Sequence, residues 1–348
     1  MAAPPARKPT IKDVAQRAGA SIAAVSYAIN GNRFVSEQLS GRIRKAIEDL
    51  DYTPSKMAQS LRRNRTQTIG LIMDDITNRF GALFTKGLES AAVEQQYTLI
   101  ISDLHGSPAN EPRSINLLLD QRVDGIIYCG FGAEEARLRE IHASGLPVVM
   151  ADKPPQSKGL PSVVIDNRAG VLAALKHLRG LGHKDIVFIN GEKINRNGQL
   201  RADAFREFMI GHGLDFREDQ IVYGDYTLEH GFQAATRVFE RRRRFTAVFC
   251  GDDMIAFGVL AGLKARGLRI PEDVAVVGFG DDPISRVFDP SLTTIHYPME
   301  EMGRQAFARF RKLIGQKRAR PQSLLLETSL RVRRSTDPGY RDDLNLDG

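Results

Sequence analysis

The pattern of apolar positions near the start of the chain predicts two short helices joined by a tight turn. Thr10 caps the first helix, whose apolar stripe comprises Ile11, Val14, Ala15 and Ala18. Gly19 then supplies a backbone position without Cβ strain. Ser21 caps the second helix, in which Val25 and Ile29 turn inward at i,i+4 spacing. The pattern indicates a helix-turn-helix, and an ordinary helical hairpin is the alternative.

The outer face of the second helix holds the residues that a helix-turn-helix presents to a DNA major groove. This face is expected to carry Ile22, Ala23, Ser26 and Tyr27. We expect base readout from Tyr27, Ile22, Ala23 and Arg33, where a tyrosine hydroxyl offers one hydrogen bond and an arginine offers a bidentate pair to guanine. Further DNA contacts of this segment are expected from Thr10, Ser21, Ser26, Asn30 and Ser36.

Positive charge is concentrated in the same segment. Residues 1–66 contain 12 Lys+Arg and 5 Asp+Glu, a net of +7, whereas residues 67–348 contain 37 of each kind. A basic segment attached to a neutral body is the footprint expected when that segment alone meets phosphates. Charge therefore supports the DNA interpretation of the helix-turn-helix.

The first residues and the cysteines indicate a cytoplasmic protein. Residues 1–9 are rich in Pro and Ala and lack the apolar core of a signal peptide, so a flexible arm is expected there. No stretch approaches the ~18 apolar residues of a membrane span. Cys129 and Cys250 each end an apolar run far from the other, which is typical of buried thiols in a reducing compartment.

A third helix and a short marginal helix follow. Ser36 can cap a helix that runs to about Leu50, which completes a headpiece over residues 10–53. Residues 55–63 return to helical spacing, but a helix of nine residues is marginal alone in water. Residues 54–66 are therefore assigned to a linker whose helix folds only when something holds it.

From Thr68 onward, apolar runs of strand length alternate with helical stretches. Strands are predicted at residues 69–73, 98–102, 125–129, 148–151, 162–165, 185–190, 247–250 and 275–279. Helices between them include residues 84–95, 170–181, 199–212, 228–241 and 254–267. Continuous apolar strands spaced by crossover helices indicate an α/β fold with parallel sheets covered on both faces.

Several motifs resemble the LacI/GalR family of transcriptional regulators. They are Thr53-Pro54-Ser55-Lys56-Met57-Ala58-Gln59-Ser60-Leu61, Ile69-Gly70-Leu71-Ile72, Val123-Asp124-Gly125-Ile126-Ile127, Pro271-Glu272-Asp273-Val274 and Leu292-Thr293-Thr294-Ile295. The resemblance runs from Thr10 to about residue 334. It implies a helix-turn-helix headpiece, a hinge helix, and two Rossmann-like parallel-sheet subdomains of the periplasmic-binding-protein type with a ligand cleft between them.

The resemblance also implies roles for the hinge. The hinge helix would pair with that of a dimer mate in the minor groove, where Leu61 wedges between base pairs and Arg62 acts beside it. Further hinge contacts are expected from Ser55, Met57 and Ala58.

The limits of the body, residues 67–334, follow from the same resemblance. The N-subdomain is expected at about residues 67–164 and 298–324, and the C-subdomain at about 165–297 and 325–334. The tail, residues 335–348, has no heptad long enough for a coiled coil, so a homodimer is expected rather than a tetramer.

Ligands of such sheets bind beyond the carboxyl ends of the strands. The candidates at these positions are Phe80, Asp103, Asp152, Arg201, Tyr226, Asp252, Asp281 and Tyr297. Carboxylates accept hydrogen bonds from hydroxyls, an arginine fork grips oxygens in pairs, and aromatic faces stack on a sugar ring or base. Each of these residues could instead satisfy backbone groups at a strand end.

The chain departs from the family pattern at the cleft. Where the family has Gly-Tyr/Phe-Asp-Asp, this chain has Gly280 in place of the carboxylate that often grips the effector, and Asp281 is the candidate substitute. Arg79 replaces a usual proline, and Gly81 replaces an aromatic residue. The added positive charge favours an acidic or phosphorylated sugar over a neutral hexose.

We therefore expect a ligand-responsive DNA-binding regulator, a repressor of carbohydrate-related genes that binds a pseudo-palindromic operator as a homodimer. Its effector would be a sugar, sugar acid or sugar phosphate, with no cofactor, metal or membrane partner. The enzyme motifs Gly-x-Ser-x-Gly, Gly-Lys-Ser/Thr and His-Glu-x-x-His are missing from the sequence. A sugar-processing enzyme or a sugar-binding module on the same scaffold is the alternative.

Overall fold

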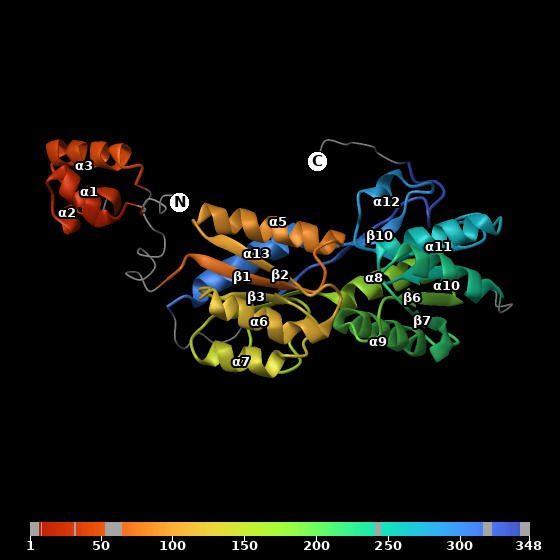
Figure 1. Cartoon of the computed structure of the whole chain (residues 1–348). Helices are drawn as coiled ribbons and strands as arrows, with labels where there is room; N and C mark the ends of the chain where they lie inside the picture. The colour runs from red at the N-terminus through yellow and green to blue at the C-terminus, as the bar shows by residue number, and fades with distance from the viewer. Residues whose placement is uncertain are drawn as a thin grey trace, which may run out of the picture. The chain divides into compact units, whose positions relative to one another are not determined.

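The chain divides into two compact units, and the boundary between them in the sequence falls after Thr66. The computed structural model describes residues 7, 9–30, 33–52, 65–240, 245–315 and 322–341, and of Asn30 only the backbone. The predicted hinge contacts Ser55, Met57, Ala58, Leu61 and Arg62 lie outside the described residues. Figure 1 labels the elements, and each unit is described here by itself.

In its described residues, the first unit is a head of three helices, α1 (Ile11–Ala18), α2 (Ile22–Asn30) and α3 (Glu37–Asp49). Gly19 ends α1 in the left-handed conformation, with φ of 58°, as the turn requires. The hydroxyl of Ser21 accepts a hydrogen bond from the Ala24 amide at 3.1 Å, which confirms the cap of α2. Ser36 occupies the N-cap position of α3, but its side chain makes no capping hydrogen bond. The core of the head consists of Val14, Ala15, Ala18, Val25, Ile43 and Ala46.

The second unit contains two parallel sheets, and the first has the strand order β11-β5-β4-β3-β1-β2. Its strands are β1 (Thr68–Met73), β2 (Thr98–Asp103), β3 (Ile126–Cys129), β4 (Val148–Asp152), β5 (Ser162–Ile165) and β11 (Ser323–Leu326). Figure 1 shows α5 (Arg79–Glu94) and α13 (Met299–Leu313) on one face. The other face is covered by α6 (Glu111–Asp120) and α7 (Glu135–Ala143). A short helix, η1 (Pro108–Asn110), precedes α6.

The second sheet has the order β12-β10-β9-β8-β6-β7, and in it β12 alone runs antiparallel to its neighbour. Its strands are β6 (Ile186–Asn190), β7 (Ile221–Tyr223), β8 (Ala247–Cys250), β9 (Ala275–Phe279), β10 (Thr293–His296) and β12 (Ser329–Arg331). Its helices are α8 (Asn167–Gly180), α9 (Arg196–Gly211), η2 (Glu218–Gln220), α10 (Leu228–Glu240), α11 (Asp253–Ala265) and α12 (Ile284–Val287).

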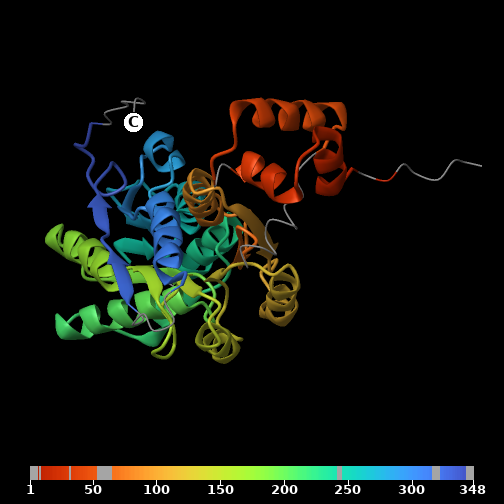
Figure 2. The ribbon, with the colours of Figure 1, turned by 90° about the vertical axis from the view of Figure 1, so that its left-hand side faces the viewer.

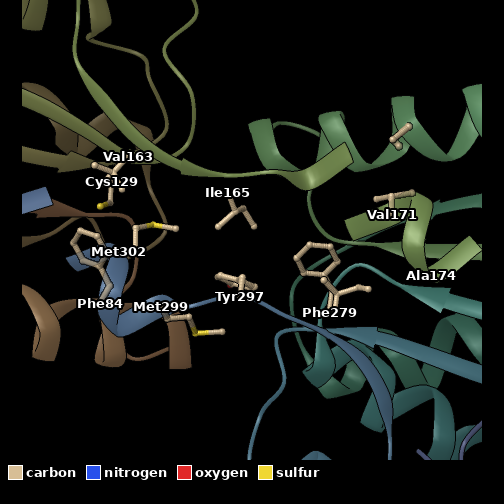
Figure 3. Packing of buried hydrophobic residues seen from close by; sticks show 14 of the residues in the cluster. Phe84, Cys129, Val163, Ile165, Val171, Ala174, Phe279, Tyr297, Met299 and Met302 are labelled. Atoms are coloured by element: carbon tan, nitrogen blue, oxygen red, sulfur yellow. The ribbon is translucent and has the colours of Figure 1, made fainter. Parts of the chain in front are cut away.

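The chain crosses between the sheets three times. The crossings follow β5, β10 and β11, so each subdomain is assembled from separate stretches of sequence. The dark blue strands near the C-terminus are the edge strands β11 and β12, and Figure 2 shows them at the outer side of the body. In Figure 3, Ile165 and Tyr297 lie between a group around Phe84 and a group around Phe279. One continuous apolar core therefore joins the two subdomains beside the crossings.

The eight predicted strands are all present, and none of their ends differs from the prediction by more than one residue. Four further strands of the described residues were missed, namely β7, β10, β11 and β12. β7 and β12 have only three residues each, and β10 begins with the polar pair Thr293-Thr294. Helix α5 begins at Arg79, five residues before the predicted start. β5 and β11 end at Ile165 and Leu326, one and two residues beyond the expected subdomain limits. Among the described helices, none combines the length and the apolar character needed to cross a bilayer.

Candidate functional site

A cleft of about 450 Å³ lies where the carboxyl ends of strands from both sheets meet. The first subdomain contributes the segment after β1, the end of β4, and the crossing after β10. The second contributes the start of α9 and the segments after β7, β8 and β9. Parallel α/β sheets bind ligands at this position. Six of the eight predicted effector residues line the cleft, namely Phe80, Asp152, Arg201, Tyr226, Asp252 and Tyr297.

Arg201 is a buried polar group of the cleft with several partners. Its Nε donates to the Asn167 side chain at 2.8 Å, and its Nη1 donates to the carbonyl of Gly251 at 2.5 Å. The guanidinium lies over the ring of Phe279, 3.8 Å from its centroid, and the residue is 5% exposed. These contacts fix the arginine fork at the cleft wall before any ligand arrives.

Asp152 projects from the end of β4 with a backbone φ of 67°, a left-handed conformation that is rare for a residue with a Cβ. Its Oδ1 accepts a hydrogen bond from Asn197 of the second subdomain at 2.9 Å. Burial raises the pKa of this carboxyl. A strained, buried acid held from both sides of a cleft is typical of a ligand-contacting position.

Lys153 lies behind the cleft and joins two of its acids. Its ammonium is 2.5 Å from Oδ2 of Asp74 and 3.6 Å from Oδ2 of Asp152. Burial by itself lowers the pKa of Lys153, but the two carboxylates outweigh burial and raise that pKa above its usual range. The lysine therefore remains charged and holds the ends of β1 and β4 together, a role that the sequence analysis missed.

Two adjacent acids begin α11. Burial, with Asp253 as a neighbouring charge, raises the pKa of Asp252 to about 7. Burial raises the pKa of Asp253 to about 6, although Thr294, Ser285 and the amide of Asp282 donate hydrogen bonds to it. Because its pKa is raised this far, the Asp252 carboxyl can hold a proton near neutral pH and can then donate a hydrogen bond to a hydroxyl as well as accept one.

The charge balance of the cleft is acidic. Seven carboxylates line it against two arginines, Arg79 and Arg201. The acids are Asp74, Asp75, Asp152, Glu229, Asp252, Asp253 and Asp282. Even with Lys153 counted behind the wall, and with Asp152, Asp252 and Asp253 left out because burial raises their pKa, acids still outnumber cations. This balance disfavours a ligand with a phosphate or carboxylate group.

Aromatic side chains complete the walls. The ring of Phe80 packs on Phe84 at a centroid distance of 5.4 Å, and Tyr297 packs on Phe279 at 5.7 Å. Tyr226 lies against Gly191, where a Cβ would come within 2.0 Å of the ring. Burial raises the pKa of Tyr226 to about 12, so its hydroxyl stays protonated and can donate a hydrogen bond.

Two predicted effector residues do not line the cleft. Asp103 ends the edge strand β2, outside the central crevice, and its carboxylate accepts from the His105 amide at 2.9 Å. Asp281 is turned away and bound by Arg333 at 2.6 Å and His296 at 3.0 Å. Burial alone would raise the pKa of Asp281, but these two partners lower it to about 2. Asp281 therefore does not replace the carboxylate that is missing at Gly280.

Three of the four residues predicted for the outer face of α2 are exposed or half-buried, and the fourth is buried. Ile22 and Ala23 are exposed, and Tyr27 is half-buried. The guanidinium of Arg33 lies 5.4 Å from the centroid of the Tyr27 ring, so two predicted base-reading residues are neighbours. Ser26 was expected on this face, but it is only 7% exposed because it lies at the edge of the face that carries Val25 and packs into the head. The sequence analysis did not single out Phe34, which is 94% exposed.

Each of the two units matches a known protein family model. Residues 10–55 match the family model of bacterial regulatory proteins, lacI family, and residues 175–336 match a periplasmic binding protein-like domain. The HTH-type transcriptional repressor PurR of Erwinia tasmaniensis is 34% identical over 338 residues, 96% of this chain and 98% of that protein. Catabolite control protein A of Priestia megaterium is 33% identical over 330 residues, 94% of this chain and 99% of that protein.

Solved structures of transcriptional regulators have a similar fold. The lac repressor dimer bound to operator and the anti-inducer ONPF superposes with a TM-score of 0.87 at 24% identity, over 95% of this chain and 99% of that one, which shows the shared fold. A complex of the transcriptional regulator CelR with cellobiose has a TM-score of 0.72 at 29% identity, over 94% of this chain and 99% of that one.

A helix-turn-helix head on a periplasmic-binding-protein-like body defines a DNA-binding transcriptional regulator with an effector-binding domain, not an enzyme. The chain belongs to the lacI family of bacterial regulatory proteins and is a DNA-binding repressor of that family.

Proposed function

We propose that the chain represses genes of carbohydrate use by binding a pseudo-palindromic operator as a homodimer, and that a neutral sugar in the cleft is its effector. The observation that carries the effector class is the excess of cleft carboxylates around the fixed fork of Arg201. Carboxylates and a guanidinium together match the hydroxyl groups of a sugar, which both accept and donate hydrogen bonds.

The neutral sugar is favoured over the sugar acid and the sugar phosphate. The charge of Arg79 was the sequence-based argument for an anion, but its guanidinium lies beside Asp282, with Nε 3.4 Å from Oδ2. Because this acid already offsets the added charge, no excess of positive charge is left for an anionic group. A sugar is also supported by CelR, a regulator of similar fold that was solved as a complex with cellobiose.

Dimer formation is supported by exposed apolar side chains on both subdomains. On the first subdomain they include Val93 of α5, Ile101 of the edge strand β2 and Leu117 of α6. On the second they include Phe232 of α10, and Ile284 and Val287 of α12. Large apolar side chains that are exposed on a single chain often mark the surface where another protein binds. We infer that a second copy covers them.

The function is tested with an operator selected from random DNA by the full chain. We expect sequence-specific retention, two chains per operator by sedimentation, and weaker retention when a neutral sugar is added. A panel of neutral sugars, sugar acids and sugar phosphates is compared by isothermal titration. Binding of a sugar phosphate but no neutral sugar would overturn the effector class, and turnover of a sugar would favour the enzyme alternative.

Tyr27 carries a specific prediction for the operator. Tyr27→Phe removes one hydroxyl and keeps the ring beside Arg33, so it should cost about 0.5–1.5 kcal/mol of operator affinity at one base position. Tyr27→Ala also removes the ring and should cost more. Both variants are measured by fluorescence anisotropy against all single-base changes of the selected operator. A Tyr27→Ala variant with the wild-type base preference at every position would contradict base readout by this residue.

A further inference from the structure

An ion pair joins the two subdomains at the cleft. Arg79 is the first residue of α5 in the first subdomain, and Asp282 follows β9 in the second. Nε of Arg79 lies 3.4 Å from Oδ2 of Asp282, and the side chains are 35% and 13% exposed. Both residues line the cleft. Since they belong to different subdomains, the pair forms only when the subdomains approach each other on this side.

The position of Arg79 is electrostatically unfavourable without this partner. The first turn of a helix carries the positive end of the helix dipole, which repels a cation. In addition, Nε of Arg79 is buried without a hydrogen-bond partner in the part of the chain that the structure describes. The negative charge of the Asp282 carboxylate lies beside this guanidinium and offsets the repulsion by the helix dipole.

Asp282 is held in place by its own subdomain. Its amide donates to Oδ2 of Asp253 at 2.7 Å, and its Oδ1 accepts from the Ile284 amide at 2.8 Å. These two bonds fix the carboxylate with Oδ2 toward Arg79. The acceptor side of the pair therefore moves with the second subdomain as a rigid group.

A second crossing contact is the hydrogen bond of 2.9 Å from Asn197 to Asp152. Its donor is a neutral amide on a residue that is 4% exposed, whereas both members of the Arg79 pair are charged and their side chains are only partly buried. Dissolved salt screens exposed charges far more than a buried hydrogen bond. The two contacts can therefore be separated experimentally by ionic strength.

We propose that Arg79 and Asp282 form an electrostatic clasp that biases the two subdomains toward the closed arrangement of the cleft. A contact present in one of two arrangements shifts their equilibrium by its own free energy. For a pair that water partly reaches, the shift is about two- to five-fold. If the closed arrangement is the one that holds the effector, a step that rests on the proposed function, effector affinity changes by the same factor.

The clasp is tested without any effector, on the full chain. Spin labels are placed on the exposed positions Ser144 and Gln233, one on each subdomain, while Cys129 and Cys250 are buried. Electron–electron resonance then measures the fraction of open molecules. The variants are Arg79→Gln and Asp282→Asn, since asparagine keeps the oxygen that accepts from Ile284. Each should raise the open-to-closed ratio about two- to five-fold, and the double variant should raise it no further.

Ionic strength and a matched variant provide the controls. Raising salt from about 0.01 M to about 1 M should open the wild type and leave the double variant unchanged. Lys86→Gln breaks an ion pair with Glu300 inside the first subdomain, 3.1 Å long, and should change nothing. Equal open fractions in the wild type and both single variants would overturn the clasp. A chain that shows the clasp but binds no sugar would instead overturn the proposed function alone.

Discussion

Replacing Arg201 by alanine is expected to weaken effector binding about 10- to 150-fold, equal to about 1.5–3 kcal/mol, and to abolish the response of operator binding to the sugar. The reason is that the Arg201 guanidinium is buried, so neither water nor the alanine side chain can replace the hydrogen bonds that it would donate to the sugar. The measurement is isothermal titration of the effector together with operator anisotropy at rising sugar concentration. Operator affinity without sugar should stay within about two-fold of the wild type, a change of about 0.4 kcal/mol.

Arg201 also supports the cleft wall, so its replacement has a structural cost. Oδ1 of Asn167 and the carbonyl of Gly251 lose the donor Arg201, and Phe279 loses the guanidinium that covers its ring. Circular dichroism and thermal unfolding therefore accompany the titration. Arg201→Lys keeps a cation over the ring but not the fork, and should still lose most of the affinity. A folded Arg201→Ala chain that answers the sugar at the wild-type concentration would remove Arg201 from the site.

Operator binding should fall about 10³- to 10⁵-fold between about 50 mM and 200 mM salt, if the dimer neutralises about 6–10 phosphates. The positive charge available for this is the net +7 of residues 1–66 in each chain. Each phosphate contact adds a slope of about −0.9 in a plot of log K against log salt, because a bound counterion is released. Anisotropy titrations over the salt series give the slope directly.

Single charges of the head can be assigned from the same plot. Arg42 and Arg44 are exposed on α3, and replacing either by glutamine should make the slope shallower by about 1.8 in a dimer, if it contacts one phosphate per chain. Lys176→Gln removes an equally exposed cation from the body, where charges balance, and should leave the slope unchanged. A wild-type slope near zero would contradict phosphate binding by the head.

Much of the fold was predictable from short-range pattern. Continuous apolar runs such as residues 247–250 are buried strands, and the spacing of Val14, Ala15 and Ala18 produced the core of the head. The strand-end rule located Asp152 and Asp252, because parallel strands bring their carboxyl ends to one crevice. In these cases a local signal and the overall fold agree, which is the condition for predicting structure from sequence.

The incorrect expectations depend on partners that are distant in sequence. Asp281 has the right residue type and position for the cleft, but Arg333, 52 residues later, binds it on the other side. Arg79 was recognised as an added charge, whereas its neighbour Asp282 was visible only in three dimensions. The sequence shows the charge of each side chain but not its ion-pair partner. The net charge that a ligand encounters in the cleft depends on both.

The three crossings between the sheets also affect how the chain acquires its structure during synthesis. Helix α13 and strand β11 complete the first subdomain, but they are encoded after all of the second subdomain except β12. During synthesis, the faces of β3 and β4 that pack against α13 therefore stay uncovered until α13 has been made. Domains usually fold in the order of their synthesis, and exposed apolar surface favours aggregation. A chain that lacks about the last seventh of the sequence, residues 299–348, has neither α13 nor β11 and leaves the core of its first subdomain exposed to water.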